Sequence, residues 1–186
     1  MVSEAMVRHV VGIEGAKAMI EIVEGAWQDL LAEPIHRYHR ATRAHIVWDY
    51  MVQRSDDLLA AMEGVERVER LTRPIYVLRD LIAVRPKLHT RDATTRNYPT
   101  RSQRVVQATG MFPDSRYQNV TFGYRLDAAE AGIEQYLITS PADAWVIDLE
   151  ELAAGELRPV ARMFDMPDIE MDWGSVPSIR FGMQTP

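Results

Sequence analysis

Hydrophobic residues change their spacing once along the chain, near Gly64. Before Gly64 they recur at steps of three and four, which places them on one face of an α-helix. This spacing predicts two amphipathic helices, over residues 14–32 and 34–62, and Pro34 suits the first turn of the second helix. After Gly64 apolar and polar residues alternate, which predicts half-buried β-strands.

The alternating part of the chain predicts a mainly antiparallel sheet of about five strands. Its strand-like segments are residues 65–71, 74–79, 81–90, 118–126, 133–139 and 144–149. Short turn sequences, such as Arg79-Asp80 and residues 140–143, separate neighbouring segments, and such turns join antiparallel strands. The fold class is therefore predicted as α+β, with the two N-terminal helices packed on the sheet.

The last part of the chain has a different character. Short helices are expected over residues 100–109, ahead of Gly110, and over residues 150–163. Residues 164–186 contain three Pro and two Gly and show no clear periodicity. We therefore predict one domain over residues 1–163 and an extended C-terminal arm over residues 164–186, which docks on its own domain or on a second copy in a homodimer.

The composition is that of a globular protein, since 47% of the 186 residues are hydrophobic and 26% are charged. No apolar run has the length of a membrane span and no secretory signal pattern opens the chain, so we expect a cytoplasmic protein without membrane contact. The absence of Cys excludes disulfides and Cys-zinc sites. The net charge of −6 combines a basic middle, residues 34–116, with acidic ends, residues 1–33 and 127–186, so extended duplex binding by the whole surface is not expected.

The most basic stretch begins at the strand over residues 81–90. From Arg85 to Arg104 there are six Arg or Lys residues and one acid. Because strand side chains alternate, Arg85, Lys87 and His89 fall on one face. Pro86 cannot donate a ladder hydrogen bond, so the strand is predicted at a sheet edge or a bulge with its basic face accessible. This concentration suits phosphate binding; the alternative is a solvated edge strand whose arginines pair with acidic neighbours.

A second, smaller basic patch is expected on the helix over residues 34–62. His36, Arg40 and Arg43 follow each other at steps of four and three, which puts them on one helix face. The histidines of this region lack a carboxylate at a matching step, so a metal site is not predicted. Surface pairing of Arg40 and Arg43 with the acidic ends of the chain is the other interpretation.

Known catalytic motifs narrow the choice of chemistry. The chain has no GxxxxGK[ST] loop, no GxGxxG after a strand and no GxSxG elbow, and neither lysine has an acid two residues before it. What remains is phosphate chemistry without a metal or a cofactor. Cutting RNA in this way would use the 2′-hydroxyl as nucleophile and would need a base, an acid and cations. His89 is the best proton donor or acceptor, and Tyr98 can stack on a base or transfer a proton. Arg91, Arg96 and Arg101 would hold the phosphate.

The segment RPKLHTRDATTRNYPTRSQRVVQA, residues 85–108, resembles part of the RelE/HigB-like ribonuclease toxins of bacterial toxin-antitoxin modules. In that part a strand ending in Leu-His is followed by a basic stretch, a Thr-Pro-like turn and a helix. The resemblance implies RNA as substrate, a cognate protein partner, and Lys87, His89, Arg91 and Arg96 as RNA-facing residues. The chain departs from the family in its acidic pI, its size, its hairpin over residues 133–149 and its C-terminal arm.

Together these interpretations name ten candidate residues. The catalytic candidates are His89, Tyr98 and Arg96, and the nucleic-acid-binding candidates are Arg85, Lys87, Arg91, Arg101, Arg104, Arg40 and Arg43. The rival hypothesis is a non-enzymatic interaction or regulatory module, of a phage accessory type, whose acidic C-terminal third meets a basic partner.

Overall fold

The computed structural model describes residues 3–70, 73–95, 117–140 and 145–155. All of them belong to one compact unit. The helical elements are α1 (Glu4–Ala32), the 3-10 helix η1 (Ile35–Arg37), α2 (Arg40–Leu58) and α4 (Leu149–Ala153). The strands are β1 (Val65–Arg70), β2 (Arg73–Leu78), β3 (Ile82–Leu88), β4 (Gln118–Leu126), β5 (Ile133–Thr139) and β6 (Val146–Asp148). The α+β class is confirmed, with six described strands instead of about five.

Helix α1 begins ten residues earlier than its hydrophobic spacing predicts. The Ser3 side chain caps it by accepting a hydrogen bond from the Met6 N–H at 3.2 Å. Gly12 interrupts the helical backbone with φ of 63°, a conformation that glycine adopts at little cost. The regular spacing that predicted residues 14–32 starts only after this kink, which explains why the first part of the helix was missed.

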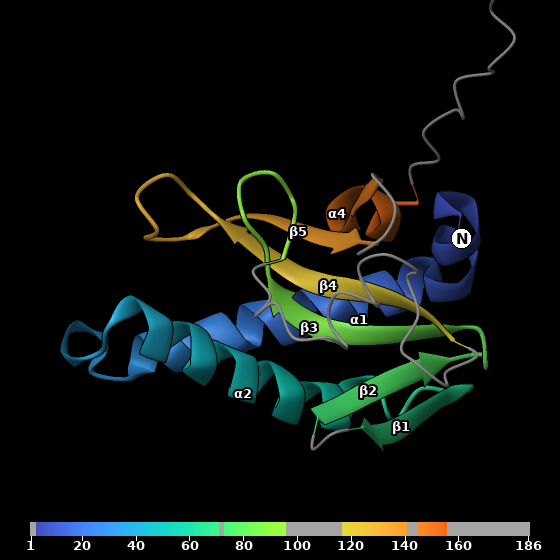
Figure 1. The fold of residues 1–186 in the computed structure, drawn as a ribbon, viewed down its shortest axis with the longest axis horizontal. Helices are drawn as coiled ribbons and strands as arrows, with labels where there is room; N and C mark the ends of the chain where they lie inside the picture. The colour runs from blue at the N-terminus through green and yellow to red at the C-terminus, as the bar shows by residue number, and fades with distance from the viewer. Residues whose placement is uncertain (1–2, 71–72, 96–116, 141–144, 156–186) are drawn as a thin grey trace, which may run out of the picture. The chain divides into compact units, whose positions relative to one another are not determined.

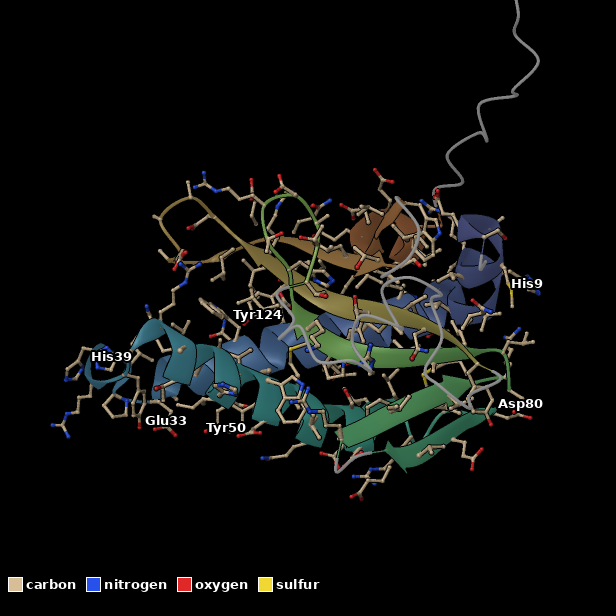
Figure 2. All side chains as sticks on the ribbon, in the orientation of Figure 1. His9, Glu33, His39, Tyr50, Asp80 and Tyr124 are labelled. Atoms are coloured by element: carbon tan, nitrogen blue, oxygen red, sulfur yellow. The ribbon has the colours of Figure 1, made fainter. Side chains whose placement is uncertain are left out.

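The connection between α1 and α2 is longer than predicted. Pro34 is followed by the short helix η1, and α2 begins at Arg40. The Tyr50 hydroxyl donates to Glu33 Oε1 at 3.0 Å, which ties α2 to the end of α1 (Figure 2). Because His36 lies in η1, its predicted place on one helix face with Arg40 and Arg43 is wrong.

The strands follow one another in the sheet in chain order, from β1 to β6. All neighbours pair antiparallel except β3 and β4, which run parallel from Ile82↔Gln118 to Leu88↔Tyr124. A parallel neighbour requires a crossover rather than a tight turn, and residues 96–116 between these two strands lie outside the described part of the chain. The sheet is therefore mainly antiparallel with one parallel pair at its centre.

The predicted edge position of the basic strand is wrong, although Pro86 does lie where the pairing of this strand with one neighbour has ended. β3 lies between β2 and β4, but its pairing with β2 ends at Tyr76↔Val84. Two residues further in the same register, Pro74 would stand opposite Pro86, and neither proline has an N–H to donate. The missing donor thus ends the β2–β3 ladder, while the β4 side of β3 stays paired.

The two faces of the sheet differ in character. Helices α1, α2 and α4 pack on one face, and Figure 1 shows α1 running behind β3 and β4. The side chains between them form the main hydrophobic core, which includes Ile82, Val84, Phe122 and Tyr124. The opposite face, called here the helix-free face because no described helix covers it, carries a small apolar cluster and a row of polar side chains. That polar row contains the candidate residues of β3.

Several predictions concern residues that the structure does not describe. The helix expected over residues 100–109 and the arm expected over residues 164–186 lie outside the described part of the chain. Of the helix expected over residues 150–163, α4 covers the beginning. None of the described helices is both long and apolar enough to cross a membrane.

Candidate functional site

Strand β3 places its candidate residues where the alternation predicts. Arg85, Lys87 and His89 point to the helix-free face, and Val84 packs in the main core on the other side. The expectation that this basic face is accessible is wrong, because Arg85 is only 7% exposed and His89 only 4%. A period-two pattern determines which residues share a face, but it does not determine whether that face is covered.

His89 is part of a buried hydrogen-bond network. Its Nε2 lies 3.2 Å from the Thr121 hydroxyl and 3.2 Å from the Thr139 hydroxyl, and these two hydroxyls are 2.9 Å apart. Its backbone N–H donates to the Tyr124 carbonyl at 2.9 Å. Nδ1 has no hydrogen-bond partner among the described residues. The network joins β3, β4 and β5 across the helix-free face.

The surroundings of His89 keep its ring uncharged. Burial, together with the charge of Lys87, lowers the pKa of His89 to about 3, although the hydrogen bond to Tyr124 acts in the other direction. A neutral imidazole whose Nε2 is already engaged is well suited to organising the sheet. Proton transfer to or from RNA would additionally require that this face open, so the catalytic role of His89 stays a prediction.

Strand alternation places three cations on the helix-free face together with Ile75 and Ala83, and we call Arg73, Arg85 and Lys87 the cation row. Burial and, to a smaller extent, the charges of Arg85 and Arg73 together lower the pKa of Lys87 to about 8. Burial, followed by the charge of Arg73, lowers the pKa of Arg85 to about 10. Neither Lys87 nor Arg73 has a carboxylate partner among the described residues. Lys87 therefore holds its positive charge where burial makes the charge costly.

A cleft of about 770 Å³ opens beside the cation row, between α2, the end of β3 and the turn after β4. We call it the α2–β3 cleft. Its charged and aromatic lining consists of Arg40, His45, Trp48, Lys87, His89, Arg91, Asp92, Arg125, Asp127 and Glu130. The two basic patches that the sequence suggests separately thus contribute to one concavity: Arg40 from α2, and Lys87 and Arg91 from the β3 side.

Some of the cleft's charges are already paired. Arg40 forms an ion pair with Glu130, and Arg125 forms one with Glu134 at 3.1 Å. Arg125 also donates to the backbone carbonyl of Arg91 at 3.3 Å. The side chains of Lys87 and Arg91 have no ion pair within the described part of the chain. These two residues are therefore the cleft cations that remain available to an anionic ligand.

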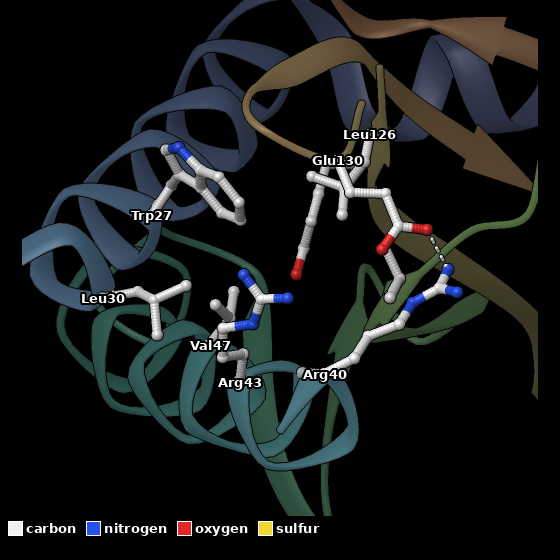
Figure 3. A pocket seen from close by; sticks show the side chains of 10 residues that line it. Trp27, Leu30, Arg40, Arg43, Val47, Leu126 and Glu130 are labelled. Atoms are coloured by element: carbon white, nitrogen blue, oxygen red, sulfur yellow. Dashed lines mark ion pairs between the residues drawn. The ribbon is translucent and has the colours of Figure 1, made fainter. Parts of the chain in front are cut away.

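A smaller cavity of about 30 Å³ lies next to the cleft and shares Arg40 and Glu130 with it. Its wall is largely apolar, formed by residues such as Trp27 and Leu30, and Figure 3 shows the Arg43 guanidinium pointing into it. Arg43 Nε is buried and finds no hydrogen-bond partner in the described residues. The structure therefore brings Arg43 close to Arg40, and Arg43 lines this cavity but not the cleft.

Four candidates cannot be placed. Arg96, Tyr98, Arg101 and Arg104 lie outside the described residues. Sequence reasoning did not identify four described residues as part of the site: Trp48, Arg73, Thr121 and Thr139. Trp48 has the spacing of a core residue, so the pattern assigned it to the core. Alternation with the core residues of β4 does place Thr121 on the face opposite the core. Its hydrogen bond with His89 could not be predicted, because it depends on the order of the strands in the sheet.

No group of three His, Cys, Asp or Glu residues that could hold a metal ion occurs in the described ranges. Comparison of the chain with protein-family models, with curated proteins and with solved structures finds no match. The resemblance to the RelE/HigB-like toxins therefore stays a prediction that rests on residues 85–108 alone.

Proposed function

We propose that the protein binds single-stranded RNA in the α2–β3 cleft. The observation that carries this proposal is the meeting of Lys87 and Arg91, which have no ion pair with any described residue, with a partly exposed indole, Trp48, in one concavity. Cations that contact phosphates and aromatic rings on which bases stack are the usual components of single-strand binding sites.

The charge balance favours a short contact over a long one. Four cations and three carboxylates line the cleft, and Arg40 is engaged by Glu130. Two available cations match about two phosphates, and the overall charge of −6 opposes binding along an extended duplex. Bases of a single strand can reach Trp48, whereas bases in a duplex are stacked on each other and cannot.

The proposal concerns binding, and cleavage is a separate hypothesis. A metal-independent ribonuclease needs a proton donor and acceptor at the scissile phosphate. His89, the residue predicted for this role, is neutral and engaged with two threonines. We therefore expect RNA to bind in the α2–β3 cleft without being cut by His89.

Fluorescence anisotropy with a labelled 12-nucleotide RNA tests the proposal. Lys87→Ala and Arg91→Ala should each weaken binding about tenfold, the effect of losing one charge-assisted contact of about 1.4 kcal/mol. The matched control is Lys17→Ala, because Lys17 is the only other lysine and its partner is Glu14 on the surface of α1.

The salt dependence gives a second readout of the same experiment. On a single strand, each phosphate contact contributes about −0.7 to the slope of log affinity against log salt concentration. Two contacts therefore predict a slope of about −1.4. Lys87→Ala should reduce this slope to about −0.7. Absence of RNA binding by the wild type, or equal loss in Lys87→Ala and Lys17→Ala, would contradict the proposal and favour the protein-interaction module.

A further inference from the structure

Strand β1 lies at one border of the sheet, where only β2 pairs with it among the described strands (Figure 1). A border strand directs every second backbone N–H and C=O away from its own sheet, where these groups can pair with a further strand. The strand at the other border, β6, has three residues, whereas β1 has six. Within the described part of the chain, β1 is therefore the longer of the two sheet borders that could accept another strand.

The side chains of β1 alternate between two different surroundings. Val68 lies opposite Ile75 of β2 and packs on the small apolar cluster of the helix-free face. Arg67 lies on the helix-covered face, where its Nε donates to Asp56 of α2 at 2.7 Å. Glu69 follows on the same face as Arg67, and both side chains are exposed. The strand thus presents one apolar side chain between two exposed charges of opposite sign.

The charges of β1 are ordered with opposite signs on the two sides of Val68. In the sequence VERVER, Arg67 and Glu69 lie one step from Val68, and Glu66 and Arg70 lie two steps from it. When two copies of one strand pair antiparallel about a central residue, each position lies opposite its mirror position. Centred on Val68, such a pair sets Arg67 of each copy opposite Glu69 of the other. Opposite charges across a strand pair are stabilising, whereas a border strand with charges of one sign would repel its own copy.

We propose that β1 is the contact surface of a homodimer, in which two β1 strands pair antiparallel about a two-fold axis at Val68. The partner is a second copy of this chain, and the two sheets continue into each other across the axis. The two Val68 side chains then lie side by side and join the apolar clusters of both copies. Asp56 accepts from Nε of Arg67, so the other guanidinium N–H groups can donate to Glu69 of the second copy. This dimer does not depend on RNA binding.

Charge reversal tests the register, with sedimentation velocity as the measurement. We expect the wild type to form a dimer at micromolar concentration. Arg67→Glu and Glu69→Arg should each weaken the dimer by about tenfold or more, because two like-charge pairs replace two opposite-charge pairs. An equimolar mixture of the two variants should dimerise again, because opposite charges then meet at both positions. The matched control is Glu14→Arg on the surface of α1, which should leave the dimer unchanged.

Disulfide crosslinking gives an independent test, since the chain has no Cys. Opposite residues of an antiparallel pair have Cα atoms about 4.5–5.5 Å apart, which a disulfide can span. With oxidised glutathione, Val68→Cys should therefore form a covalent dimer. Val146→Cys, at a 41% exposed position of β6, should form little of it.

Each outcome supports the β1 dimer or overturns it. A monomeric wild type, with no crosslink in Val68→Cys, overturns it. A dimer that neither charge reversal weakens overturns β1 as the contact surface and leaves a dimer through another surface. Variants that are folded by circular dichroism but do not associate when mixed overturn the register centred on Val68. If a charge reversal unfolds the chain, the comparison of Val68→Cys with Val146→Cys decides.

Discussion

Replacing Lys87 with methionine should stabilise the folded protein at neutral pH. Methionine keeps a long apolar stem but removes the charge of Lys87, which the charges of Arg85 and Arg73 disfavour. The pKa of Lys87 is lowered to about 8 from an ordinary value of 10.5. One pKa unit corresponds to about 1.4 kcal/mol, so the charge costs at most about 3 kcal/mol of folding stability, and about 1–3 kcal/mol once solvent screening of this half-buried group is considered.

The direction of the pH dependence follows from the same shift. Below pH 8 the ammonium is charged in both the folded and the unfolded chain, and the full cost applies. Between pH 8 and about 10.5 the folded protein releases its proton first, so the unfolded state binds more protons and wild-type stability rises with pH. The advantage of Lys87→Met should therefore be largest at pH 7 and should disappear near pH 10.5.

Urea unfolding followed by tryptophan fluorescence at pH 7 and pH 10 measures both effects. Lys17→Met is the matched control, because Lys17 is exposed and paired with Glu14, and its free energy of unfolding should change by no more than about 0.5 kcal/mol. If Lys87→Met destabilises the protein at pH 7, or changes its stability equally at both pH values, the interpretation of Lys87 as a cation whose burial costs stability is wrong. Loss of RNA affinity in the same variant would show that RNA binding requires the charge of Lys87, although this charge destabilises the folded protein.

Three further predictions concern stability and affinity. Gly123→Ala should destabilise the fold by about 3 kcal/mol or more in urea unfolding, because a Cβ at this position would lie 1.8 Å from the Lys87 carbonyl oxygen. Unchanged stability would mean that β3 and β4 are not so closely paired. Acidification from pH 6.5 to pH 5 should lower the free energy of unfolding of the wild type by up to about 2 kcal/mol, because a pKa of His89 near 3 means that the unfolded chain takes up the proton first. His89→Gln should lose this pH dependence, and the same dependence of stability on pH in both proteins would refute the buried, neutral state of His89. Glu130→Gln should raise RNA affinity about threefold in anisotropy measurements by releasing Arg40 from its ion pair, with little effect on stability because exposed pairs contribute less than about 1 kcal/mol; weaker binding would contradict the role given to Arg40.

The sequence predicts much of the fold because most of the elements depend on local patterns. Helical spacing and alternation locate α2 and the strands to within a few residues, apart from the start of α2. The parallel pairing of β3 with β4 could not be predicted, since it joins strands that are separated by residues 96–116. The same pairing explains why the edge position predicted from Pro86 is wrong. Pro86 has no backbone N–H, which indicates where the ladder with one neighbouring strand ends, but it does not indicate whether the other side of β3 is paired.

The candidate site was predictable only in its parts. Alternation identified the face shared by Arg85, Lys87 and His89, and helical spacing identified Arg40 as a surface cation. Their meeting in one cleft depends on how α2 packs against β3, which is a tertiary property. The burial of His89 and its bonds to Thr121 and Thr139 likewise depend on strand order, so a residue that resembled a catalytic acid or base in the sequence is a buried hydrogen-bonded residue in the fold.

The most direct test of the central claim is an NMR titration of the lysine side chains. The chain has only two lysines, so ¹³Cε-labelled lysine gives one signal for Lys87 and one for Lys17. We predict that Lys87 titrates near pH 8 in the free protein, and that single-stranded RNA shifts its signal and raises its pKa towards the ordinary value, while Lys17 is unaffected. An ordinary pKa of Lys87 in the free protein, or signals of both lysines that do not respond to RNA, would contradict the claim that the half-buried cation Lys87 binds RNA phosphate in the α2–β3 cleft.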